Sequence, residues 1–181
     1  KGFSGIYVGV DENTYFLERA VEATRDGEAG SYIFIQGSLA DSNWMEMVDH
    51  ADVICSFAAL HHLPGEDLHR QFFSTISSKL SPNGRLFLSC WQVLGNPRLE
   101  KHLVPWGPME INSPSINQAD LLLDWRADPG KPAKLRYVHH FSPQELRNLG
   151  ESQGLILQDE FYSDGKEGNL GLYQVWQKPC S

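Results

Sequence analysis

The sequence has few cysteines, no long apolar run and a deficit of positive charge. Its three cysteines, Cys55, Cys90 and Cys180, are an odd number, and no pair has the spacing of metal ligands. We therefore expect a reducing, cytoplasmic location and no bound metal ion. No apolar run approaches the ~20 residues that a membrane helix needs, and a net charge of −8 opposes nonspecific binding to nucleic acid. Neither a membrane nor DNA is an expected partner.

Length and composition are those of an ordinary soluble protein. The 181 residues are 41% hydrophobic and 21% charged, which is typical of a globular chain that can bury a core. The length favours a single domain over residues 1–181. The negative net charge does not exclude an RNA substrate, because a local basic patch or a partner subunit could hold it.

Short apolar segments alternate with amphipathic helical patterns through the first half of the chain. A helix capped by Asn13 or Thr14 and a second helix that ends near Leu80 lie between predicted strands. The proline and glycine of residues 81–84 predict a turn. Strands that alternate with helices predict an α/β fold with a Rossmann-like, mostly parallel sheet. These strands cover residues 5–10, 31–36, 52–57 and 85–91.

The last forty residues predict a different arrangement. Ser142-Pro143-Gln144-Glu145 is a capping box with proline at the first helical position, so a helix begins there and ends near Gly154. Residues 155–162 and 170–177 then form two strands. Because a loop without a helix joins them, we predict a C-terminal antiparallel hairpin.

Residues 97–136 are unlike the rest of the chain. They are rich in proline, tryptophan and asparagine, and a short helical pattern covers residues 119–125. A connection of this length between core elements is usually functional or disordered, and its tryptophans favour an ordered structure. We predict an insertion over the substrate side of the sheet.

Polar residues follow the predicted strands, at the edge where open parallel sheets bind ligands. Asp11 ends the first strand, where a carboxylate would accept hydrogen bonds from both ribose hydroxyls of an adenosine cofactor or would stabilise a helix N-terminus. Ser38 and Leu39 follow the second strand and would contact an adenine edge, unless the segment is a plain turn. Small residues around Ala58 would let a ligand approach the backbone after the third strand.

Histidines occur in two adjacent pairs. His61 and His62 cannot easily present both rings to one metal ion, so we favour a histidine that caps or packs the loop. Arg136, Tyr137 and His139 lie just before the capped helix. Together they would hold an anionic substrate with the arginine bidentate, unless they form a surface strand with incidental charge.

Residues 7–11, 51–63 and 80–89, in this order, resemble class I S-adenosylmethionine-dependent methyltransferases. They are similar to that family's second strand with its ribose-binding acid, its fourth strand with the following loop, and the turn into its fifth strand. The family's glycine-rich loop would precede residue 1, so the resemblance implies an N-terminally incomplete domain that lacks the first strand and helix. It also implies S-adenosyl-L-methionine as the cofactor, bound by Asp11, Glu12, Ser38, Leu39, Phe57, Ala58 and His61.

One position departs from the family's pattern. The family often has an acidic residue near the adenine amino group, after its third strand. Here that position is Ser38, and Asp41 is nearby. The resemblance therefore implies less about adenine recognition than about ribose recognition.

A second resemblance is narrower, to the tRNA wobble-uridine methyltransferases, which esterify a carboxymethyl group on the uridine. It is carried by Trp91, residues 102–106, residues 136–141 and Glu145-Leu146. It implies tRNA as substrate and a small zinc-binding activator protein as partner. The catalytic residues that it implies are Arg136, Tyr137 and His139.

Two alternatives remain, a small-molecule methyltransferase and a non-catalytic, methyltransferase-like scaffold. The acceptor decides the expected chemistry. A carboxylate acceptor is already a nucleophile, so Arg136 would only orient it. A neutral acceptor needs a general base, and His61 or His139 would serve.

Overall fold

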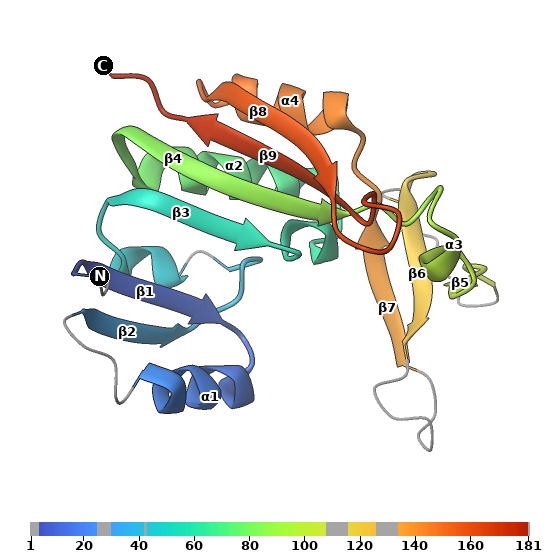
Figure 1. Cartoon of the computed structure of the whole chain (residues 1–181), viewed down its shortest axis with the longest axis horizontal. Coiled ribbons are helices and arrows are strands. Elements are labelled where there is room, and N and C mark those ends of the chain that lie inside the picture. The colour runs from blue at the N-terminus through green and yellow to red at the C-terminus, as the bar shows by residue number, and fades with distance from the viewer. Residues whose placement is uncertain (1–3, 25–29, 42, 108–115, 126–133, 181) are drawn as a thin grey trace. The chain divides into compact units, whose positions relative to one another are not determined.

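The computed structural model describes residues 4–24, 30–41, 43–107, 116–125 and 134–180 (Figure 1). The chain divides into two compact units, Lys1–Asp49 and His50–Ser181. The expectation of one domain over the whole chain stays a prediction. Within the described ranges, no helix has the length and apolar character needed to cross a membrane.

The first unit is a parallel strand–helix–strand motif. Its elements are β1 (Ile6–Asp11), α1 (Thr14–Thr24), β2 (Ser31–Gln36) and the short 3-10 helix η1 (Asn43–Met47). The side chain of Asn13 accepts the N–H of Tyr15 at 3.0 Å, which confirms Asn13 as a cap of the first helix. β1 and β2 pair in parallel until Asp11 lies opposite Gln36, so their carboxyl ends coincide.

The second unit contains a sheet in the order β3-β4-β9-β8, whose four strands lie side by side in Figure 1. The β3–β4 pair is parallel, whereas β4–β9 and β8–β9 are antiparallel, which confirms the C-terminal hairpin. The fold class is therefore α/β with parallel and antiparallel pairs. The elements are β3 (Ala51–Phe57), η2 (Leu60–His62), α2 (Glu66–Lys79), β4 (Leu80–Trp91), α4 (Pro143–Ser152), β8 (Ile156–Ser163) and β9 (Gly171–Gln177).

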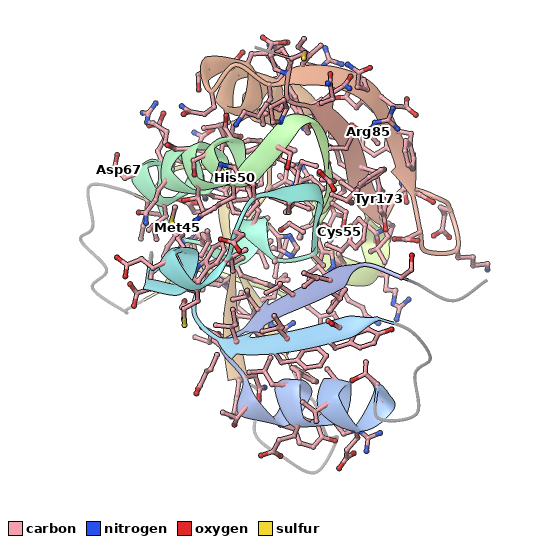
Figure 2. The ribbon with its side chains drawn as sticks, turned by 90° about the vertical axis from the view of Figure 1, so that its left-hand side faces the viewer. Met45, His50, Cys55, Asp67, Arg85 and Tyr173 are labelled. Atoms are coloured by element: carbon pink, nitrogen blue, oxygen red, sulfur yellow. The ribbon has the colours of Figure 1, made fainter. Side chains whose placement is uncertain are left out.

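Helices α2 and α4 cover one face of this sheet. Trp176 of β9 is fully buried there, and its ring meets that of Phe73 of α2 edge-on, with 6.2 Å between the ring centroids. A Cβ at Gly150 of α4 would lie 2.6 Å from the Trp176 ring, so the helix approaches this closely only because the residue is glycine. The strand register places Cys55, Arg85 and Tyr173, labelled in Figure 2, on the opposite face.

The predicted turn at residues 81–84 is wrong. β4 begins at Leu80, and these residues form an irregular part of the strand. Ala51 pairs with Leu80 but Val53 pairs with Arg85, so the register shifts here. Asn83 adopts a positive φ of 62° and its N–H donates to the carbonyl of Lys178, so the C-terminal segment supplies the hydrogen bonds that a turn would lack.

A third sheet, in the order β5-β6-β7, occupies much of the predicted insertion. The helical pattern predicted at residues 119–125 is wrong, because this segment is a strand that pairs with β7 and β5. Leu123 is buried beside Val93, Leu99 and Val138, and this tertiary burial decides the structure of a short apolar run. Residues 108–115 and 126–133 of the insertion lie outside the described residues. The elements are α3 (Pro97–Glu100), β5 (Leu103–Val104), β6 (Asp120–Trp125) and β7 (Lys134–His139).

Candidate functional site

The first unit carries the predicted ribose-binding residue. Asp11 is half-buried at the carboxyl end of β1, and its Oδ1 accepts the N–H of Asn13 at 2.8 Å. Its carbonyl oxygen accepts the N–H of Gly37 at 3.1 Å, which ties the ends of the two strands together. A carboxylate has about four acceptor positions, so one local hydrogen bond leaves capacity for a ligand.

The other predicted cofactor residues of this unit lie next to it. Glu12 is exposed, and Ser38 and Leu39 are half-buried after β2. Ser38 Oγ accepts the N–H of Ala40 at 3.3 Å, and the Ser38 carbonyl accepts the N–H of Asp41 at 3.0 Å. The segment is thus a hydrogen-bonded turn, and its adenine-binding role stays a prediction.

In the second unit, the end of β3 has an unusual backbone conformation. Ala58 adopts a φ of 52°, which costs a residue with a Cβ about 1–2 kcal/mol. Its N–H donates to the carbonyl oxygen of Ser89 at 3.0 Å and to the Ser89 hydroxyl at 3.2 Å, and these bonds hold the conformation. Backbone strain of this kind clusters at ligand sites. The preceding Phe57 is 56% exposed, so its side chain is accessible to a cofactor, as the predicted contact requires.

The histidine that follows in η2 is fully buried. His61 Nδ1 accepts the backbone N–H of Trp91 at 3.3 Å, and its ring centroid lies 5.0 Å from that of Trp91. His61 Nε2 has no hydrogen-bond partner among the described residues. Burial, followed by the nearby His62 and Arg136, lowers the pKa of His61 to about 2, so its ring is neutral.

Arg136 joins this cluster from β7. Its guanidinium carbon lies 5.8 Å from the centroid of the Trp91 ring, within cation–π range. His62 Nδ1 hydrogen-bonds the carbonyl oxygen of Tyr137 at 2.9 Å and so links η2 to β7. The residues that were predicted separately after β3 and on β7 therefore come together around Trp91.

Tyr137 and His139 belong to a chain of hydrogen bonds that continues from β7. Asp120 Oδ1 accepts the Tyr137 hydroxyl at 2.5 Å and pairs with His139 Nδ1 at 2.7 Å. His139 Nε2 pairs with Glu145 Oε1 at 2.8 Å. Asp120 and His139 are 4% and 2% exposed, so this network is a buried one.

The charge state of His139 follows from its two carboxylate partners. Burial alone would lower the pKa of His139, but the hydrogen bonds to Glu145 and Asp120 outweigh it and raise the pKa above its ordinary value. A protonated ring donates from both nitrogens and has no lone pair to accept a proton. This placement favours positioning of Tyr137 and β7 over direct contact with a substrate.

Sequence reasoning missed the central acid of the network. Asp120 was hidden because it precedes three leucines in a segment with a helical pattern. The one available signal was its position directly before an apolar run. An acidic side chain that such a run draws into the core needs hydrogen-bond partners, because burying an unpaired carboxylate is costly. Glu145 was predicted as part of the capping box and of the wobble-uridine resemblance, but not as a partner of His139; the Ser142 Oγ does accept its N–H at 3.2 Å.

With this geometry established, comparison with known proteins identifies the family. Residues 7–159, most of the chain, match the methyltransferase domain family. The chain belongs to the methyltransferase domain family. It is therefore an enzyme, which counts against the scaffold alternative.

Solved structures share the fold of this methyltransferase at low sequence identity. A SAM-dependent methyltransferase from Methanosarcina mazei matches with a TM-score of 0.72 and 18% identity over 97% of this chain and 83% of the other. One from Clostridium acetobutylicum gives 0.65 and 10% over 98% and 85%. The glycopeptide N-methyltransferase MtfA with S-adenosyl-L-homocysteine gives 0.62 and 12% over 95% and 73%. A comparison with curated proteins gives no match.

The cofactor of this methyltransferase is S-adenosyl-L-methionine. In the first unit, the Asp11 carboxylate lies at the ends of two parallel strands and has spare acceptor capacity. In the second unit, the buried His61 Nε2 lacks a partner in the described part of the chain, as expected of a group that meets a ligand. The individual residue assignments stay predictions.

One cluster has the composition of a metal site. His69, His139 and Glu145 offer three ligand atoms within 4.8 Å of one another. However, His139 Nε2 and Glu145 Oε1 lie 2.8 Å apart, whereas two ligands of one tetrahedral zinc ion lie about 3.3 Å apart. His69 Nε2 already hydrogen-bonds the Leu63 carbonyl at 2.7 Å. Direct hydrogen bonds therefore satisfy this cluster without an ion.

The buried histidines make stability depend on pH in both directions. The pKa of His139 is raised, so its contribution is fully present below its ordinary pKa of 6.5 and is lost as pH rises through the raised value. Burial lowers the pKa values of His61, His69 and His140, so their contribution is lost progressively as pH falls from 6.5 toward the lowered values. Folding stability is expected to be highest near neutral pH.

Urea unfolding across about pH 5 to 9 measures this dependence through the midpoint of the transition. In a His139→Leu variant the decline at high pH is expected to shrink, while the decline at low pH remains. A wild-type midpoint that keeps rising from neutral to alkaline pH contradicts the assignment of His139 as a protonated ring.

Proposed function

We propose that this methyltransferase converts the carboxymethyl group of a modified wobble uridine in tRNA to its methyl ester. The observation that carries the proposal is the Arg136 guanidinium over the Trp91 ring, on the strand that also supplies Tyr137. An arginine on an aromatic surface offers a planar, bidentate partner for a carboxylate. The segments that resemble the wobble-uridine enzymes include both Trp91 and Arg136.

The state of the two candidate bases also favours an anionic acceptor. His61 Nδ1 is occupied by the Trp91 N–H, and His139 is held between two carboxylates. Neither ring offers a lone pair that is ready to take a proton from a neutral amine or hydroxyl. A carboxylate needs no base, because it is already a nucleophile.

Catalysis by the chain's own residues would then consist of positioning. Bound S-adenosyl-L-methionine supplies a methyl group on a positive sulfonium. Arg136 would hold and orient the acceptor carboxylate, while the buried network keeps Tyr137 and the rest of β7 in place. Correct alignment of two bound reactants contributes up to about 7–11 kcal/mol of barrier reduction.

The acidic surface bears on how tRNA would be held. With a net charge of −8, the chain has little general attraction for phosphate. A small zinc-binding activator protein, as in the wobble-uridine enzymes, would supply the missing positive charge. This partner is part of the proposal.

A small-molecule methyltransferase is the second candidate. The fold is shared with the glycopeptide N-methyltransferase MtfA and with the N-methyltransferase NodS from Bradyrhizobium japonicum, at TM-scores of 0.62 and 0.59. The acidic composition agrees with a substrate other than nucleic acid. An amine acceptor would, however, need a base other than His61 and His139.

Transfer of a radiolabelled methyl group from S-adenosyl-L-methionine tests the proposal. The acceptors are bulk tRNA from cells that lack the ester and a panel of small amines and carboxylic acids, each assayed with and without an activator protein. We expect label in tRNA that mild alkali releases, because a methyl ester is hydrolysed and an N-methyl group is not. Alkali-stable label on a small amine contradicts the proposal and supports the second candidate.

A further inference from the structure

His61 is a buried polar group that the positioning mechanism does not use. It is fully buried in η2, where its ring lies 4.3 Å from that of His62 and 5.0 Å from that of Trp91, measured between centroids. The backbone N–H of His61 also contacts the thiol of buried Cys90. The ring is thus packed between two aromatic neighbours, and its backbone is tied to β4.

The hydrogen bond at Nδ1 decides where the ring proton lies. The backbone N–H of Trp91 points at Nδ1 from 3.3 Å, and a backbone N–H can only donate. Nδ1 must therefore be the unprotonated, accepting nitrogen, and the neutral ring carries its proton on Nε2. Protonation of both nitrogens would set two N–H groups against each other.

The Nε2–H group that results is an orphan donor. It has no hydrogen-bond partner among residues that the structure describes, and leaving a buried donor unsatisfied costs about 1–3 kcal/mol. The nearby charge is positive, because the Arg136 guanidinium carbon lies 5.8 Å from the centroid of the same Trp91 ring that His61 packs against. A neutral donor beside a guanidinium on an aromatic surface is a combination that recognises an anionic oxygen.

We propose that His61 donates a hydrogen bond from Nε2–H to a carboxylate oxygen of a bound ligand and does not act as a base. Two ligands of a methyltransferase carry such a group: the amino-acid end of the cofactor and the proposed acceptor. The acceptor case rests on the proposed function, whereas the cofactor case does not. The shared chemistry is a carboxylate within reach of His61.

A pair of variants separates the two edges of the ring. His61→Asn keeps an acceptor for the Trp91 N–H at the place of Nδ1 but has no donor at the place of Nε2. His61→Gln keeps an N–H donor near the place of Nε2 but has no acceptor at the place of Nδ1. His50→Asn, which changes an exposed histidine, is the control. ¹⁵N spectra of histidine-labelled wild-type protein are expected to show His61 with its proton on Nε2 at neutral pH; a proton on Nδ1 overturns the inference.

Calorimetric titrations identify the source of the carboxylate. The cofactor probes are S-adenosyl-L-homocysteine and methylthioadenosine, which lacks the amino-acid end, and each is titrated alone. The acceptor probes are 5-carboxymethyluridine and its amide, and each is titrated with S-adenosyl-L-homocysteine present. If the cofactor is the partner, His61→Asn weakens S-adenosyl-L-homocysteine by about 10- to 100-fold and leaves methylthioadenosine unchanged. If the acceptor is the partner, His61→Asn weakens the binding of 5-carboxymethyluridine by the same factor and leaves the binding of its amide unchanged.

The controls make failure of the inference distinct from failure of the proposed function. His61→Gln is expected to retain more affinity than His61→Asn, and His50→Asn to stay within about threefold of wild type. Equal binding of all probes by wild type and His61→Asn overturns the inference alone. If wild-type protein binds S-adenosyl-L-homocysteine but neither 5-carboxymethyluridine nor its amide, the proposed function is contradicted. In that case a loss of S-adenosyl-L-homocysteine affinity in His61→Asn still supports the inference. Wild-type protein that binds no probe overturns both.

Discussion

Replacement of His139 by leucine is expected to lower the free energy of unfolding by about 3–5 kcal/mol. The substitution removes the shared partner of Asp120 and Glu145 and leaves their carboxylates facing each other across an apolar side chain. Asp120 is 4% exposed and cannot regain water without opening the structure. In the wild type, burial alone would raise the pKa of Asp120, but the hydrogen bonds from His139 and Tyr137 lower it. The negative charge of Asp120 therefore depends on these two hydrogen bonds.

Urea unfolding of wild type and His139→Leu at neutral pH measures this loss. Arg147→Gln is the control, because it breaks the partly exposed ion pair of Arg147 with Glu160 and is expected to destabilise the protein much less than His139→Leu. Glu145→Gln is expected to fall between the two, since the Glu145 side chain is 34% exposed. A loss below about 1 kcal/mol in His139→Leu would show that the network contributes little to stability.

Replacement of Arg136 by alanine is expected to reduce kcat/KM for a carboxylate acceptor by about 100-fold. In the proposed function the guanidinium over Trp91 binds the acceptor, so its loss would leave a carboxylate without a charge-assisted partner. Arg136→Lys keeps the charge but loses the planar, bidentate geometry, so we expect it to recover only part of the loss. Folding should survive, because Arg136 is half-buried and not part of the Asp120 network.

Steady-state kinetics with S-adenosyl-L-methionine in excess distinguish a role of Arg136 in binding the acceptor from a role in aligning it. An increase in KM alone indicates that Arg136 only binds the acceptor, whereas a fall in kcat indicates alignment in the transition state. Arg70→Ala, on the exposed surface of α2, is the charge-matched control and should leave both constants unchanged. Unchanged kcat/KM in Arg136→Ala removes the central observation behind the proposed acceptor.

The sequence predicted the elements whose signals are local. The capping box at Ser142 predicted the start of α4, and the side chain of Ser142 does accept the Glu145 N–H. The alternation of apolar segments predicted the parallel pairs β1–β2 and β3–β4, and the helix-free loop predicted the antiparallel β8–β9 hairpin. These signals suffice because caps, turns and strand periodicity act over a few residues.

The two wrong predictions concern segments whose structure depends on distant partners. Residues 120–125 have leucines that suit either a helix or a strand, and pairing with β7 decides for a strand. Residues 81–84 contain a proline and a glycine, yet hydrogen bonds to Lys178 draw them into β4. Propensity is a weak force beside a ladder of hydrogen bonds and a buried face.

By itself, the sequence determined the α/β class, most element boundaries and the residue types available for binding an anion. Only the tertiary structure determined what those residues can do. It placed Asp120 between Tyr137 and His139, raised the pKa of His139 and lowered that of His61. The physical reason is that protonation and hydrogen-bond direction depend on burial and on partners far apart in the chain, which local sequence patterns do not encode.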